Sequence, residues 1–122
     1  MEIVDANIVL RYILDDHVDL SEKARQIIDN HAIEVPIEVL CEVVFVLNSV
    51  YKVESKEIGT ALHGFFENTN CELPHRDAVL TGLDLFMENN LDFVDCILAG
   101  YKIVKNATVY TFDKRLQKLL DR

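Results

Sequence analysis

Two carboxylates stand at the start of an apolar helix in the stretch Leu91-Asp92-Phe93-Val94-Asp95-Cys96-Ile97-Leu98-Ala99-Gly100-Tyr101. Asp92 precedes the helical run, where a short side chain can accept a backbone N–H of the first turn, so we predict that it is the N-cap. Asp95 lies among apolar residues, where a carboxylate must find donors or a cation, or become protonated. It could also be the third member of a capping box with Asp92.

The composition indicates one globular domain over residues 1–122. The chain is 50% hydrophobic and 27% charged, and it has no linker, repeat or low-complexity tract. No apolar run reaches the length of a membrane span, and no basic region followed by an apolar stretch opens the chain. We therefore expect a cytoplasmic protein with no membrane partner. The cysteines are odd in number and widely spaced, which favours reduced core thiols: Cys41, Cys71 and Cys96.

The formal net charge of −9 counts against non-specific binding of nucleic acid. A polyanion would meet a repulsive long-range field, and few counterions would be released on contact. Any nucleic-acid substrate must therefore be held locally, by divalent cations or by a small basic patch.

Short apolar runs alternate with longer helical patterns along the whole chain. Strands are predicted at residues 2–4, 32–35, 71–73 and 107–112. Helices are predicted at residues 7–14, 21–30, 37–51, 55–68, 77–88, from 92 onward, and 114–120. This alternation is typical of an α/β fold with a parallel sheet and helices on its faces.

Four carboxylates should meet at one rim of that sheet. Asp5 and Asp113 follow the first and last strands, and Glu42 lies early in a helix that follows a strand. Asp95 begins a helix that runs antiparallel to the next strand and therefore starts at the same end. Open α/β sheets bind ligands at this end. Asp5 and Asp113 can also be interpreted simply as N-caps.

The residues that flank these four carboxylates are apolar, so we expect the carboxylates to be partly inward and close together. Like charges that close cannot all stay ionised without a cation. Oxygen donors without histidine select hard ions, so the expected cofactor is Mg²⁺ or Mn²⁺.

Four segments in this order resemble the PIN domain, and especially its VapC-type toxins. They are Val4-Asp5-Ala6-Asn7, Glu42 in an apolar helix, residues 91–99, and Tyr110-Thr111-Phe112-Asp113-Lys114-Arg115-Leu116. The resemblance implies a three-layer α/β/α sandwich with a short, mostly parallel central sheet. It also implies metal-dependent cleavage of RNA by the toxin component of a toxin–antitoxin pair.

By the same resemblance, the catalytic and metal-binding positions are Asp5, Glu42, Asp95 and Asp113. Asn7 and Thr111 match the polar supports of the family. Arg11, one helical turn after Asn7, and Lys114 or Arg115 beside Asp113 could face a phosphate, or could be solvated charges on their helices. Asp92 stands beside Asp95 as a further supporting residue.

Two protein partners are expected besides the RNA substrate. The helix at residues 36–51 carries more apolar residues than one buried face needs, which predicts a homodimer. The toxin resemblance predicts a small antitoxin protein with a basic side chain that reaches the acidic rim.

Other functions remain open from the sequence. A PIN-like binding module could receive a basic peptide of a partner in its acidic pocket and hydrolyse nothing. A phosphotransfer enzyme of the haloacid dehalogenase kind would need a second aspartate where the chain has Asn7. Metal-dependent cleavage of RNA by pure protein distinguishes the nuclease from the binding module.

Overall fold

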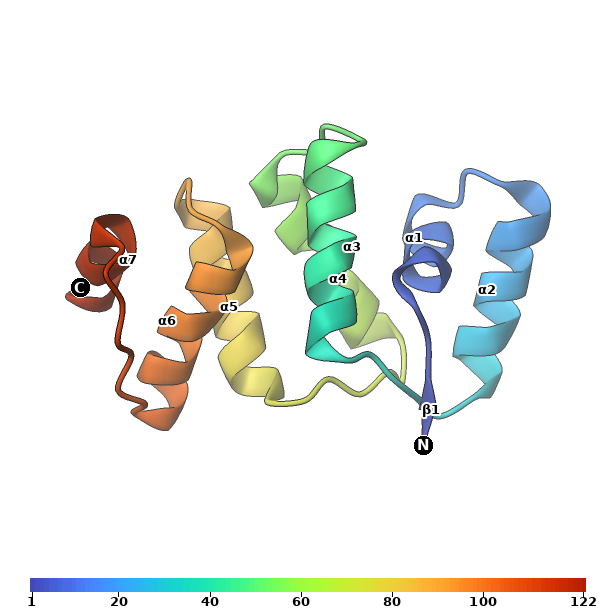
Figure 1. Ribbon diagram of the computed structural model, residues 1–122. Helices are drawn as coiled ribbons and strands as arrows, with labels where there is room; N and C mark the ends of the chain where they lie inside the picture. Colours follow the sequence, from blue (N-terminus) through green and yellow to red (C-terminus); the bar gives the residue numbers. More distant parts are fainter.

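The computed structural model describes residues 1–122 and consists of seven helices and a two-stranded parallel sheet (Figure 1). The strands are β1 (Glu2–Ile3) and β2 (Ile33–Glu34). The helices are α1 (Ala6–Leu14), α2 (Val18–Asn30), α3 (Ile37–Ser49), α4 (Ser55–Asn68), α5 (Arg76–Glu88), α6 (Phe93–Lys105) and α7 (Lys114–Leu120). No helix is both long enough and apolar enough to span a membrane.

Three of the four predicted strands meet in the expected parallel arrangement. Glu2 lies opposite Ile33 and Ile3 opposite Glu34, while Glu34 forms a parallel bridge with Glu72. The Glu72 N–H donates to the carbonyl of Ile33 at 2.8 Å. The α/β prediction is therefore confirmed as a mainly helical chain with a short parallel sheet. The sheet is too small to separate two helical layers, so the three-layer arrangement stays a prediction.

The predicted strand at residues 107–112 is wrong. Residues 108–112 make no backbone–backbone hydrogen bond, and the side chains of Tyr110 and Phe112 are 92% and 103% exposed. Figure 1 shows this segment rising along the left edge to α7, far from β1 at the lower right. A strand needs a neighbouring edge as well as β-forming residues, and here the segment has no partner strand.

The helix α2 begins three residues before the predicted start at Ser21. The Nδ1 atom of His17 accepts the N–H of Leu20 at 3.1 Å and caps the helix. The His17 N–H donates in return to Ser21 Oγ at 3.3 Å. Two unpaired donors near the helix start are satisfied in this way, so a histidine performs the capping that serine or aspartate usually performs.

One hydrophobic cluster joins the helices, from Val9 in α1 through Leu40 in α3 to Leu116 in α7. All three cysteines are free. Cys71 and Cys96 are buried, as predicted for core thiols, but Cys41 is only partly buried and lines a groove. Burial raises the pKa of Cys96 to about 12, so its thiol stays protonated and unreactive at neutral pH.

Candidate functional site

Four of the predicted site residues line one pocket between α1 and α3. Asp5, Asn7, Arg11 and Glu42 contribute to this cavity of about 360 Å³, together with Tyr51. Asp5 leaves the carboxyl end of β1 and caps α1, since its Oδ1 accepts the N–H of Ile8 at 3.2 Å. Its Oδ2 remains available to a ligand.

Arg11 is held by two partners that the sequence did not indicate. Its guanidinium donates to Asp16 at 2.6 Å and to the hydroxyl of Tyr51 at 2.8 Å. These contacts raise the pKa of Arg11, chiefly through the Tyr51 hydrogen bond. The buried Nε has no partner. Tyr51 lies 40 residues away in the chain, so no local signal could have identified the pair.

Asp92 and Asp95 do not form the capping box that the sequence allowed. Asp92 occupies the N-cap position of α6 as predicted, but its side chain makes no capping hydrogen bond. Asp95 lies in the first turn and is partly buried, again with no hydrogen bond to its carboxylate. Both carboxylates therefore keep their oxygens free.

The pKa of Asp95 is raised, first by burial and then by the negative charges of Asp92 and Asp113. Arg115 opposes this shift. The negative charges of Asp92 and Asp113 thus act on Asp95 in the first turn of α6, and this repulsion is of the kind expected among carboxylates without a bound cation.

Asp113 begins α7, and its Oδ1 accepts the N–H groups of Arg115 and Leu116 at 2.9 and 3.0 Å. The Oγ1 of Thr111 accepts the N–H of Asp113 at 3.0 Å. Thr111 therefore contacts the backbone of Asp113, and its role as a polar support of the site stays a prediction. As in Asp5, the second carboxylate oxygen is free.

Glu42 stands between the two groups of acidic residues. It lines the pocket that contains Asp5, and it also lines a groove of about 580 Å³ that contains Asp92 and Arg115. The groove has an apolar floor that includes Phe86 and Phe93. Glu42 is the residue common to both cavities.

The predicted convergence of all four carboxylates is not present in the structure. No group of three or more histidine, cysteine, aspartate or glutamate side chains lies close enough to hold one metal ion. Asp95 is partly buried, but Asp5, Glu42 and Asp113 are exposed, contrary to the expected inward placement. One reason is that residues 107–112 do not join the sheet, so Asp113 does not lie beside β1. Asp5, Glu42 and Asp95 do not form a group of three either.

The donor chemistry nevertheless suits a hard divalent cation. Asp5, Glu42, Asp95 and Asp113 offer only carboxylate oxygens, which are the ligands that Mg²⁺ and Mn²⁺ prefer. Bringing them around one ion would require Asp113 to move toward Asp5. It would also require Asp5, Glu42 and Asp95 to move closer together.

We expect the metal-free protein to lose stability as pH rises from the unfolded pKa of Asp95, near 4, through its raised folded pKa. A carboxyl with a raised folded pKa binds more protons in the native state, so ionisation favours the unfolded chain. Asp95→Asn should weaken this pH dependence and be no less stable than the wild type at neutral pH. Urea unfolding across this pH range measures the effect.

Asp77→Asn is the matched control, because Asp77 also lies in the first turn of a helix. Its removal should cost a few tenths of a kcal/mol through the helix dipole, and the loss of stability with rising pH that Asp95 causes should remain. A loss of about 1 kcal/mol in Asp95→Asn at neutral pH would instead show that Asp95 stabilises its helix.

A comparison with protein families identifies the class of protein. The family model for the PIN domain matches residues 3–120, which include all four predicted acidic positions. The chain therefore belongs to the PIN domain family, whose members are generally nucleases. No curated protein and no solved structure showed a significant match.

Proposed function

We propose that this PIN domain is a divalent-metal-dependent endoribonuclease and the toxin component of a toxin–antitoxin pair of the VapC type. The family match over residues 3–120 carries the proposal. The test is cleavage of single-stranded RNA by the purified protein with Mg²⁺ or Mn²⁺, and loss of cleavage in EDTA.

Asp5, Glu42, Asp95 and Asp113 would hold the metal, which lowers the pKa of a bound water and neutralises charge on the phosphate. Asp5 and Asp113 can each use their free Oδ2 while Oδ1 continues to cap a helix. One of these carboxylates, or a neighbouring group, would take the proton of that water.

The three-layer sandwich is part of this proposal. It requires residues 107–112 to pair with the edge of β1 that β2 leaves free. Residues 108–112 have no backbone–backbone hydrogen bonds to break, and pairing would carry Asp113 toward Asp5. The less exposed residues Ala107, Val109 and Thr111 already alternate with exposed ones, as along a strand.

The absence of a three-carboxylate group favours one alternative function. In a catalytically silent binding module, Asp5 and Glu42 would receive a basic side chain of a partner in their shared pocket. Binding of a lysine- or arginine-containing peptide, without RNA cleavage in either metal, would support this alternative.

We also propose a homodimer whose contact includes Phe45 of α3 and Val50, directly after it. Both residues also line the cavities beside Glu42, so the contact would lie next to the proposed site. Phe45 and the adjacent Val50 are 65% and 66% exposed, so part of this apolar helix has no intramolecular cover. Sedimentation should show a dimer at micromolar concentration and a shift to monomer in the Phe45→Ser/Val50→Ser variant. Val18→Ser, at an 86% exposed site on α2, is the control and should remain dimeric. A strictly monomeric wild type would contradict the proposal.

A small antitoxin is proposed to occupy the groove that Glu42 and Asp92 line. Apolar side chains would pack on Phe86 and Phe93, and a basic side chain would face the two carboxylates.

A further inference from the structure

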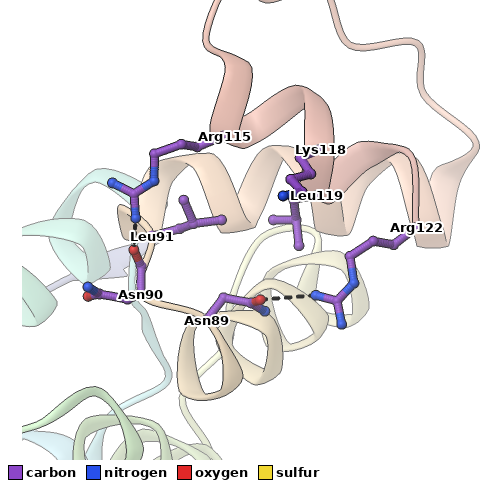
Figure 2. A pocket seen from close by; sticks show the side chains of 7 residues that line it. All are labelled: Asn89, Asn90, Leu91, Arg115, Lys118, Leu119 and Arg122. Carbon is purple, nitrogen blue, oxygen red and sulfur yellow. Dashed lines mark hydrogen bonds between the residues drawn. The ribbon is translucent and has the colours of Figure 1, made fainter.

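A basic pocket of about 580 Å³ lies between the loop that follows α5 and the helix α7. Its lining contains three cations, two asparagines and two leucines: Asn89, Asn90, Leu91, Arg115, Lys118, Leu119 and Arg122 (Figure 2). No aspartate or glutamate side chain lines it. The site is therefore positively charged in a chain whose net charge is −9.

The cations of this pocket are not neutralised by ion pairs. The salt bridges of the structure involve Arg11, Arg25, His31 and His63, and none involves Arg115, Lys118 or Arg122. Residues 101–122 hold six of the twelve lysines and arginines but only two of the 21 acidic residues. The positive charge of the chain is thus concentrated at this end.

Hydrogen bonds to neutral groups hold the two guanidinium groups in place. Arg115 donates to the carbonyl oxygen of Asn90, and Arg122 donates to Asn89 Oδ1 at 3.0 Å (Figure 2). Asn89 is itself fixed, because its side-chain amide donates to the carbonyl of Leu85 at 2.8 Å. Each arginine keeps most of its N–H donors for a ligand, and Lys118 has no hydrogen-bond partner in the structure.

We propose that this pocket binds backbone phosphates of the single-stranded RNA, an inference that rests on the proposed nuclease function. Guanidinium groups match phosphate oxygens in paired hydrogen bonds, and an ammonium adds a point charge. The cluster supplies the local basic patch that an acidic protein needs to hold a polyanion.

The position of the pocket favours RNA over an acidic peptide. Asn90, Leu91 and Arg115 line both this pocket and the groove that contains Glu42 and Asp92. A strand with a phosphate at Arg115 can therefore continue directly into the acidic groove, where the scissile bond would lie. Either polyanion would meet the carboxylates of that groove, and RNA is favoured because a divalent ion held by those carboxylates would neutralise its phosphate.

The experiment measures binding of a fluorescent single-stranded RNA in EDTA, where no cleavage occurs, as a function of salt. The triple variant Arg115→Gln/Lys118→Gln/Arg122→Gln should weaken binding about tenfold or more at low salt. The slope of log K against log salt should become shallower by about 2, because each neutralised phosphate of a single strand contributes about 0.7 to it. The matched control Lys23→Gln/Lys52→Gln/Lys56→Gln makes the same change in net charge and should leave the slope near that of the wild type.

The single variant Lys118→Gln controls for misfolding of the triple variant, because the side chain of Lys118 makes no hydrogen bond or ion pair that its replacement could disrupt. It should still reduce the slope by about 0.7. The inference is overturned if the pocket variants bind RNA like the control variant. It is also overturned if a poly-glutamate peptide, or inorganic phosphate at the RNA's concentration, displaces the RNA completely.

Because binding is measured without metal, the two proposals can fail separately. Normal cleavage together with unchanged RNA binding in the pocket variants refutes only the phosphate pocket. Pocket-dependent RNA binding without cleavage in Mg²⁺ or Mn²⁺ refutes only the nuclease.

Discussion

Asp95→Asn is expected to slow Mg²⁺- or Mn²⁺-dependent cleavage of single-stranded RNA by about a hundredfold or more. Asp95 is the only one of the four proposed ligands that is partly buried, and its carboxylate has no hydrogen-bond partner. Asparagine keeps the size of the side chain but removes the charge that would hold the metal. Single-turnover cleavage of a defined RNA, with Asp77→Asn as the control, measures the loss.

The same variant can be tested without knowing the RNA target. Metal at a hundredfold excess over its dissociation constant should stabilise the wild type by about 2.7 kcal/mol. This stabilisation should shrink as pH falls toward 4, because protonated carboxyls do not bind metal. It should nearly vanish in Asp95→Asn. If Asp95→Asn cleaves RNA and responds to metal like the wild type, Asp95 is not a metal ligand and the four-carboxylate site is wrong.

Gly100→Ala is expected to cost about 3 kcal/mol of folding stability or more. A Cβ atom at Gly100 would lie 2.2 Å from the carbonyl oxygen of Ala78 and 3.0 Å from the backbone nitrogen of Gly82. Both contacts are with the backbone of α5, so α5 and α6 would have to separate. Urea unfolding monitored by circular dichroism gives the free-energy change.

Gly64→Ala is the matched control in α4. A Cβ atom there meets nothing closer than the Asn68 amide at 3.9 Å. Alanine should therefore stabilise the helix by about 0.5 to 1 kcal/mol, since it loses less backbone entropy than glycine. Equal and small effects at Gly64 and Gly100 would show that α5 and α6 are not in such close contact.

The packing of α5 on α6 also matters for the proposed site. Asp95 and Gly100 belong to the same helix, and a displaced α6 would move Asp95 relative to Glu42 in α3. Loss of cleavage in Gly100→Ala would therefore be an indirect effect, and it would be accompanied by loss of stability. Asp95→Asn should lose cleavage without losing folding stability.

The amino-acid sequence by itself determined most of the helices and the order of three strands. These features depend on local patterns, namely apolar residues at helical spacing and capping residues such as Asp5 and Asp113. It also determined the family, because the acidic residues of the PIN pattern stand in the right order along the chain. Even the contact of Thr111 with the backbone of Asp113 is one between near neighbours.

Only the tertiary structure decided which other parts of the chain the predicted segments and site residues contact. Residues 107–112 have the composition of a strand, but strand pairing depends on an adjacent edge, which no local pattern specifies. Asp113 is therefore placed by its packing with α6 rather than beside β1. Likewise, the contact of Arg11 with Tyr51 and the gathering of Arg115 and Arg122 around Asn89 and Asn90 join distant parts of the chain. Such contacts depend on how the helices pack, and packing is settled by the whole core at once.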